Sequence, residues 1–447
     1  MPITVEFAPK KEEILKKGDE ECKELAEKLR EAGKVYIDSD FPPNVTSIGV
    51  LKNYDTGEFQ VPKSDEPWLQ PKEFIKPHYL REDCVDEWKV WDNPQPFHVK
   101  QGDLGDCGLI AALMAVAQKK GLIEQIIPKR GYTMDCGIVQ VRLLVNGEWK
   151  VIKTDFHIPQ VDGWEIFSKM TKRQCWVAFI EKAFAKVKGS YGQLDSLCPT
   201  EAFKCLTGHP SKRNCINSKT NSDALWEDLI KHNSSGSFLA AATPRIEEGS
   251  EEKKKYEEVD LDTNHAYAIL GFKEHKGHRL LRLGHGNWNR FKGKWSHLHA
   301  YDNEFLKDLC SLDREISNER IFWMEIEDFR RLFLCYFVCG HREWFTAVRF
   351  KEIVRRKKGD DMQCKIRSGK EDELCECLSF CTNYWHPVPP KSRSIVGVVA
   401  SDEDEPITVS VDVQYSINYL YFKWINRLAA WIVRDEILNF TPLESEN

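Results

Sequence analysis

Hydrophobic residues recur at helical spacing in three stretches of the chain. Residues 11–32 combine this periodicity with opposite charges three and four positions apart, which is typical of an exposed helix. From Cys107 the chain becomes almost wholly apolar, and the spacing predicts a helix with hydrophobic residues at 109, 110, 113, 114, 116 and 117. A third helix is predicted over 174–189, where Gly189 and the lysines before it indicate a helix end.

Alternating polar and apolar residues predict the strands. Segment 137–155 alternates around Asn146-Gly147, a pair that favours a β-hairpin. The runs "HAYAILGF" and "RLLRLGH" are predicted to pair across the turn "KEHKGH", and 407–417 predicts a strand in a β-rich C-terminal region. The charged run 247–258 is predicted to be a solvated loop, and the prolines of "DSDFPPNVTSIG" indicate a docked arm and long loops.

Length and composition restrict the class of protein. For 447 residues, two or three domains are expected, and 41% hydrophobic with 30% charged residues is typical of a globular protein. The net charge of −6 argues against a nucleic-acid partner held by a basic surface. No apolar run is long enough for a transmembrane segment, and "MPITVEFAPKKEE" lacks the apolar block of a secretory signal. We therefore expect a cytoplasmic location.

Of the fifteen irregularly spaced cysteines, Cys107 has the position with the clearest chemical consequence. It stands where the loop "QGDLGD" becomes the apolar helix, and the free N–H groups and dipole of a helix N-terminus favour a thiolate. Gly102 and Gly105 allow a tight turn before it, whereas Asp106 opposes thiolate formation unless it caps the helix. Cys107 is a candidate nucleophile, and the alternative is a structural cysteine.

A cysteine nucleophile needs a base, an orienting group and an oxyanion donor. His265 begins an apolar strand beside the small Ala266, where an imidazole could face a cleft; the alternative is an ordinary surface histidine. Gln101 precedes Cys107 by six residues, so its amide could reach back over the thiol. Asn287, next to an aromatic residue, is the candidate to orient the imidazole.

The order of these segments resembles the catalytic core of calpains, which are papain-like intracellular cysteine proteases. The resemblance lies in "QGDLGDCGLIAAL", "NHAYAILGF" and "RLLRLGHGNWNRFKGKWS", in this order. Supporting matches are "FPPNVTSIG", "WLQPKEF", "GEWKVIKTDFHIP", "WVAFIEKAFAKVKGSYGQL" and "FWMEIEDFRRLF", so that the likeness covers about residues 25–335. It implies that Cys107 is the nucleophile, His265 the base and Gln101 the oxyanion-hole donor.

The resemblance also implies a fold class, which is α+β: a two-lobed papain-like protease core followed by a small β-sandwich-like C-terminal domain. Residues 1–34 would form a helical arm and 35–200 the mainly helical lobe that carries the cysteine. Residues 201–337 would form the β-rich lobe that carries the histidine, and 338–447 a truncated relative of the calpain third domain.

Two positions depart from the family pattern. Gly108 replaces the tryptophan that usually follows the nucleophile, which removes an aromatic wall and loosens the first helical turn. The family motif Asn-Pro-Trp-Gly reads "GHGNWN" here. Alignment forward from "LLRL" puts His285 at the asparagine position, and alignment backward from "FKGKWS" puts Gly284 there. Asn287 reaches it if the loop has slipped, Asn289 is a further candidate, and the orienting role could also be lost.

Calcium binding by the core is expected to be lost. The family core binds two calcium ions through acidic side chains, as a hard cation requires. At the matching positions this chain has His98, Gln174, Arg290 and His297, and it contains no "DxDxDG" loop. The resemblance therefore implies that no cofactor is required.

The C-terminal cysteines are candidates for a zinc site, which would be separate from the calcium positions. Cys335 and Cys339 have His341 nearby, and Cys375, Cys377 and Cys381 have His386 nearby. Because these spacings miss the paired CxxC pattern of structural zinc sites, buried thiols are the preferred interpretation.

The predicted function is that of an intracellular cysteine endopeptidase that cleaves a limited number of sites in protein substrates. The alternative is a pseudoprotease that keeps the fold as a protein-binding or regulatory module, which Gly108 and the altered asparagine loop favour. The expected partners are protein substrates and a regulatory protein that could drive lobe closure, with no nucleic acid.

Overall fold

The computed structural model describes residues 5–7, 11–52, 59–60, 67–73, 88–145, 148–209, 211–287, 291–295 and 320–340, and five strand segments between 348 and 432. Its helices are α1 Lys11–Glu31, α2 Val45–Ile48, α3 Cys107–Val116, α4 Leu122–Ile126, α5 Gly131–Cys136, α6 Trp176–Lys188, α7 Pro199–Thr207, α8 Ser222–Ser234, α9 Glu251–Glu258 and α11 Ile326–Leu332. The three predicted helices correspond to α1, α3 and α6. Gly189 ends α6 with φ of 104°, a left-handed conformation that glycine adopts without strain.

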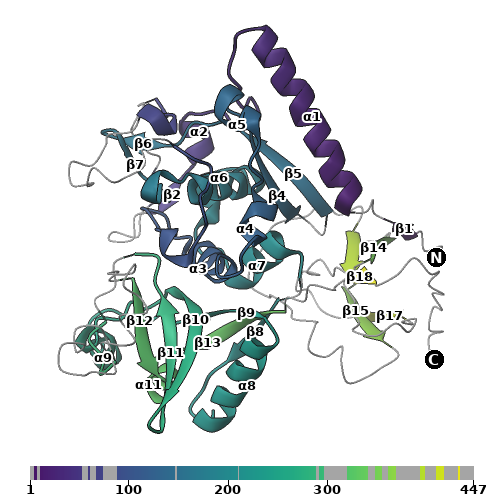
Figure 1. The fold of residues 1–447 in the computed structure, drawn as a ribbon. Helices are drawn as coiled ribbons and strands as arrows, with labels where there is room; N and C mark the ends of the chain where they lie inside the picture. Colours follow the sequence, from purple (N-terminus) through teal and green to yellow (C-terminus); the bar gives the residue numbers. More distant parts are fainter. Residues whose placement is uncertain are drawn as a thin grey trace.

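The strands of the protease-like region are β2 Leu51–Lys52, β3 Phe59–Gln60, β4 Val139–Val145, β5 Glu148–Thr154, β6 Gln160–Val161, β7 Trp164–Glu165, β8 Ser211–Cys215, β9 Phe238–Ala242, β10 Ala266–His275, β11 His278–Gly284, β12 Ile321–Glu325 and β13 Cys335–Cys339. The predicted hairpin is confirmed, because β4 and β5 pair antiparallel with Val145 opposite Glu148. Helices α1 and α6 pack on this hairpin (Figure 1).

Six strands form one sheet in the order β12-β11-β10-β9-β13-β8, with antiparallel neighbours. Figure 1 shows α3 and α7 on one side of this sheet and α8 and α11 on the other. The first half of β10, residues 266–270, is apolar without a break because both of its faces are covered. Ala266, Ala268 and Leu270 pack with the core around α3, whereas Tyr267 and Ile269 pack with the core beneath α8 and α11.

Two sequence predictions are wrong in detail. The charged run 247–258 is not all loop, since α9 begins after Ser250, whose hydroxyl accepts the Lys253 backbone N–H at 3.1 Å. The turn "KEHKGH" is shorter than predicted, because β10 and β11 continue through most of it. Only Lys276 and Gly277 form the turn, with φ of 46° and 81° as a tight hairpin requires.

The C-terminal part is described as the strands β14 Val348–Val354, β15 Asp361–Ser368, β16 Arg393–Gly397, β17 Val409–Ser416 and β18 Trp431–Ile432. The strand predicted at 407–417 is confirmed as β17, which pairs with β15. Strand β14 pairs with β16, with β18 and with the N-terminal strand β1 Val5–Phe7. The β-sandwich arrangement and the four domain boundaries stay predictions.

Among the helices in the described ranges, none has both the length and the apolar character that crossing a bilayer requires.

A buried ion pair joins α6 to the end of β5. Lys182 Nζ lies 2.6 Å from Asp155 Oδ1, and both side chains are fully buried. Burial by itself would raise the pKa of Asp155, but the hydrogen bond from His157 and the Lys182 ammonium outweigh it and lower the pKa to about 2. The pair therefore stabilises the fold fully above the unfolded-state pKa of 3.8, and this contribution is lost as the pH falls through 2.

We expect Asp155→Ala to lower the free energy of unfolding at pH 7 by about 3–5 kcal/mol, because it leaves the Lys182 ammonium buried without its partner. Urea denaturation measures the change. The control is Glu20→Ala, which removes an exposed pair 4.0 Å from Lys16 and should change stability by less than about 1 kcal/mol. Equal effects of the two substitutions would contradict the assignment.

Candidate active site

Cys107 is the first residue of α3, as the sequence predicts, and lies where that helix meets the six-stranded sheet. The loop before it is packed tightly against the chain, since a Cβ at Gly102 would overlap the carbonyl oxygen of Phe167. The remainder of α3 is entirely buried. The apolar helix therefore anchors the cysteine, and the loop leaves its side chain at the rim of a pocket.

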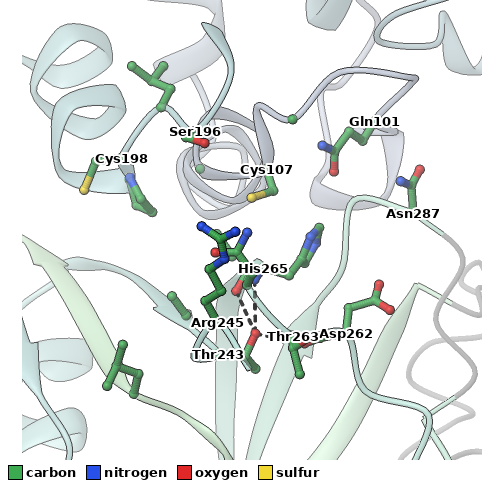
Figure 2. A pocket seen from close by; sticks show the side chains of 18 of the residues that line it. Gln101, Cys107, Ser196, Cys198, Thr243, Arg245, Asp262, Thr263, His265 and Asn287 are labelled. Atoms are coloured by element: carbon green, nitrogen blue, oxygen red, sulfur yellow. Dashed lines mark hydrogen bonds between the residues drawn. The ribbon is translucent and has the colours of Figure 1, made fainter. Parts of the chain in front are cut away.

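Cys107, His265, Gln101 and Asn287 all line this pocket, which has a volume of about 1670 Å³. Figure 2 shows the side chains of Cys107 and His265 pointing toward the same space, with Gln101 beside them. Helix α3 packs on strand β10 at this point, and the backbone N–H of Ala266 lies near enough to the Cys107 sulfur to favour its thiolate. The structure thus brings all four predicted residues to the lining of one pocket, while their catalytic roles stay predictions.

In this conformation the cysteine and the histidine are both neutral. Burial raises the pKa of the Cys107 thiol to about 11, despite the N–H of Ala266. Burial, together with the neighbouring His285, lowers the pKa of His265 well below its ordinary value. An attack on a carbonyl carbon therefore requires that His265 accept the thiol proton as a general base, rather than starting from a preformed thiolate.

Burial also affects the carboxyl group beside Cys107. Asp106 does not cap α3 with its side chain; it is fully buried near Glu181 of α6. Burial and the neighbouring Glu181 raise the pKa of Asp106 well above its ordinary value. Glu181 accepts the hydroxyl of Ser168 at 2.7 Å, and burial raises its pKa to about 7. Asp106 therefore opposes the thiolate less than an exposed carboxylate would.

Gln101 stands beside the cysteine, but its amide is turned toward its own loop. Nε2 donates to the Leu104 carbonyl oxygen at 2.6 Å, and it lies 3.4 Å from Asp106 Oδ1. Oε1 is buried and has no hydrogen-bond partner. Donation to an oxyanion therefore requires a rotation of this side chain.

The side chain that packs against His265 is the imidazole of His285, not the amide of Asn287. The two imidazoles stack with centroids 4.2 Å apart and planes 25° apart. Asn287 contributes its backbone N–H to His285 Nδ1 at 3.0 Å, and no hydrogen bond joins its side chain to His265 in the described structure. His265 Nε2 is left buried without a partner. The orienting role of Asn287 stays a prediction, and Asn289 lies outside the described residues.

Sequence reasoning missed Asp262, which lines the same pocket. Its Oδ2 lies 2.9 Å from His285 Nε2, and the adjacent imidazole lowers the pKa of the Asp262 carboxyl. The only signal was its place three residues before His265, in "DTNHAY". His285 had a stronger signal, because forward alignment of the family motif puts it at the asparagine position.

Gly108 is required by the packing of the loop that precedes α7. A Cβ on Gly108 would overlap the carbonyl oxygen of Leu197 and lie 3.0 Å from Pro199 Cδ. Backbone therefore occupies the space into which a larger residue would project. The glycine is explained by close approach, in addition to the expected loosening of the helix start.

Four residues replace the acidic calcium ligands that the resemblance leads us to expect. Two of them, His98 and Gln174, lie in the described residues and contact each other. Gln174 Nε2 lies 3.4 Å from His98 Nδ1, and Gln174 Oε1 accepts the backbone N–H of Asp92 at 2.7 Å. Burial, with Lys172 and Arg320 nearby, lowers the pKa of His98 to about 4. This neutral pair beside two cations offers little to calcium. Arg290 and His297 lie outside the described residues.

Only some of the cysteines that were considered for a C-terminal zinc site lie in the described residues. Cys335 hydrogen-bonds with Arg213, and Cys339 lies 3.4 Å from Thr207 Oγ1, so each thiol has a different polar neighbour. His341 and the cysteines at 375, 377 and 381 lie outside the described residues.

Comparison with known proteins gives the same family throughout. The family described as "Calpain family cysteine protease" matches residues 36–340. The chain is 29% identical to the Calpain-type cysteine protease DEK1 of Arabidopsis thaliana over 316 residues, which are 68% of this chain and 14% of that protein. It is 26% identical to Calpain-13 of Rattus norvegicus over 76% of this chain and 51% of that protein. Calpain-1 catalytic subunit of Mus musculus is 26% identical over 74% of this chain and 45% of its own length.

We expect Gly108→Ala to lower the free energy of unfolding by about 1–3 kcal/mol, because the new methyl group must push Leu197 away from α3. Thermal denaturation measures the loss. Gly131→Ala is the matched control, since Gly131 also begins a helix but has no atom within 4 Å of its added Cβ. If Gly108→Ala leaves the free energy of unfolding unchanged, the loop before α7 can move to admit the methyl group and the prediction is wrong.

The raised pKa of Cys107 predicts how fast its thiol reacts with iodoacetamide at different pH values. Since only the thiolate reacts, the rate should rise about tenfold per pH unit from pH 7 until it approaches the pKa of about 11. A free cysteine levels off near its ordinary pKa of about 8.5. Peptide mass spectrometry follows the labelling of Cys107. A plateau below pH 8 would instead reveal a thiolate–imidazolium pair.

Proposed function

Since the chain belongs to the calpain family of cysteine proteases, we propose that it is a cysteine endopeptidase with Cys107 as nucleophile and His265 as general base. The observation that carries the proposal is the contact of the Cys107 sulfur with the backbone N–H of Ala266. Because Ala266 follows His265 directly, this contact holds the nucleophile and the base on one rim of the pocket.

In the proposed mechanism, His265 takes the thiol proton as the Cys107 sulfur attacks the peptide carbonyl carbon. The oxyanion accepts hydrogen bonds from the Cys107 backbone N–H and from the Gln101 amide after that side chain has rotated. The imidazolium then gives its proton to the leaving amine, and an acyl-enzyme remains. Water, deprotonated by His265, hydrolyses the thioester and restores the thiol.

The size and charge of the pocket support a protein substrate. Its volume is about 1670 Å³, and cationic and anionic side chains share its lining, among them Arg213, Arg245, Lys253, Glu247 and Asp262. A pocket of mixed charge selects no single charge class, which suits an extended peptide segment. We propose limited cleavage of cytoplasmic proteins, with a regulatory protein as the means of control.

The chain spans about a seventh of the plant relative and about half of the rat relative. We propose that calcium at the core positions is not required, because His98 and Gln174 satisfy each other and lie next to Lys172 and Arg320.

A specific observation favours the second candidate, a pseudoprotease that binds proteins. His265 Nε2 is buried and unpaired, and the adjacent ring stacks on it instead of accepting a hydrogen bond. An imidazolium formed during the reaction would then lack the partner that stabilises it in Cys-His-Asn proteases. This arrangement would slow the chemistry while leaving the binding groove intact.

The test is to incubate the full chain with casein, in EGTA or in added calcium, and to follow the fragments by gel electrophoresis. We expect cleavage at rates that agree within about twofold in the two buffers. Cys107→Ala should lower the rate by at least about a thousandfold, because it removes the nucleophile.

Cys198→Ser is the matched control, since Cys198 lines the same pocket and its sulfur is 3.1 Å from Thr200 Oγ1. It should leave cleavage unchanged. No cleavage in either buffer, together with no labelling of Cys107 by a peptidyl epoxide, would support the binding module and end the peptidase proposal.

A further inference from the structure

Asp262, His265 and His285 form a cluster of metal-binding side chains at the edge of the pocket. One ligand atom from each can be chosen so that all three lie within 4.8 Å of one another. In the described ranges they are the one such group of three. We propose that this cluster binds a divalent transition-metal ion, with Zn²⁺ as the best fit.

The spacing of the three groups is close to what a zinc ion requires. Zinc lies about 2.0–2.2 Å from nitrogen and oxygen ligands, so that ligand atoms in a tetrahedral site are about 3.4 Å apart. His285 Nε2 and Asp262 Oδ2 are already 2.9 Å apart. The stacked rings of His265 and His285 must tilt for their lone pairs to converge on one point.

The surroundings of His285 allow one of its nitrogens to bind a metal. His285 is 1% exposed, and its Nε2 faces Asp262 Oδ2 at 2.9 Å. Its Nδ1 lies 3.0 Å from both the backbone carbonyl oxygen and the backbone nitrogen of Asn287, so it can donate to the oxygen or accept from the N–H. A metal on Nε2 would select the tautomer in which Nδ1–H donates to the oxygen, which is the usual support of a metal-binding histidine.

His265 contributes an unsatisfied nitrogen. Its Nε2 is buried without a hydrogen-bond partner. An orphaned imidazole nitrogen is costly in a buried site, and a cation held between it and the Asp262–His285 pair would satisfy it.

The backbone around Asp262 is held in place. Its carbonyl oxygen accepts the hydroxyl of Thr243 at 2.8 Å and that of Tyr267 at 3.2 Å. The nearest competing cation is Lys253, which is itself engaged with Glu248 at 2.9 Å. The carboxylate is 64% exposed, so it can turn toward the rings without disturbing the core.

The donor set indicates which ion fits. Two imidazole nitrogens and one carboxylate oxygen suit zinc and other transition metals, with a fourth position left open to water from the pocket. Calcium needs six to eight oxygen ligands at about 2.3–2.6 Å, which this cluster does not supply. The site is therefore distinct in its chemistry from the calcium positions of the family.

Metal binding would have a direct consequence for catalysis. This part of the inference rests on the proposed peptidase function. If His265 ligates zinc, its lone pair cannot accept the proton of Cys107. Zinc would therefore inhibit the peptidase reversibly. His285 and Asp262 would hold the ion against His265 and so allow it to block the general base.

The test measures binding of Zn²⁺ alone to the full chain by competition with a chromogenic chelator. The chain carries Cys107→Ser and is treated with N-ethylmaleimide beforehand, so that accessible thiols do not contribute. We expect one zinc ion per chain. Asp262→Asn and His285→Phe should each weaken binding by at least about 10- to 100-fold, and the phenylalanine keeps the ring stacking. Melting temperatures verify that both variants fold.

His278→Ala is the control, because His278 pairs with Glu325 on another part of the sheet. It should leave zinc affinity unchanged. The proposal is overturned if zinc fails to bind, if the Asp262 and His285 variants bind as tightly as the parent, or if Cys107→Ser abolishes binding. These readouts need no peptidase activity, so the zinc site and the proposed function can fail separately.

Discussion

The contact between the start of α3 and the start of β10 is the constraint on which the rest of the site depends. The Ala266 N–H lies near the Cys107 sulfur, and both faces of Ala266–Leu270 are buried, one of them against α3. A helix that brings no polar side chain to this interface can approach the sheet closely. Its first residue then meets the strand next to His265, which directly precedes it. Cys107 and His265 come to one pocket because an apolar helix packs on the apolar start of a strand.

The same close packing determines which groups near the cysteine carry charge. Burial disfavours the thiolate of Cys107, the imidazolium of His265 and the carboxylate of Asp106. The helix N-terminus, which alone would favour the thiolate, is outweighed by desolvation in this conformation. The proposed catalysis then depends on proton transfer within the pocket rather than on a thiolate–imidazolium pair that is already formed. A site of this kind responds strongly to any group that contacts His265.

His285 is that group, and the sheet register explains its place. Strands β10 and β11 pair with Ala268 opposite Gly284, so the residue after Gly284 comes beside Tyr267 and next to His265. An amide at this position could accept the imidazole N–H. An imidazole instead stacks on the ring and turns its own nitrogen toward Asp262. The loop after β11 thus places the ring of His285, rather than an amide, against His265.

The sequence alone determined the elements and the candidate nucleophile. The helices α1, α3 and α6, the β4–β5 hairpin and the position of Cys107 follow from periodicity, turn residues and the start of an apolar run, all of which are local. The helical part of 247–258 was missed because Ser250 caps a segment without an apolar face. The tertiary structure decided the grouping of Asp262, His265 and His285, the burial of Asp106 beside Glu181, and the need for glycine at 108. Each depends on register or burial across elements far apart in the chain, which local patterns do not encode.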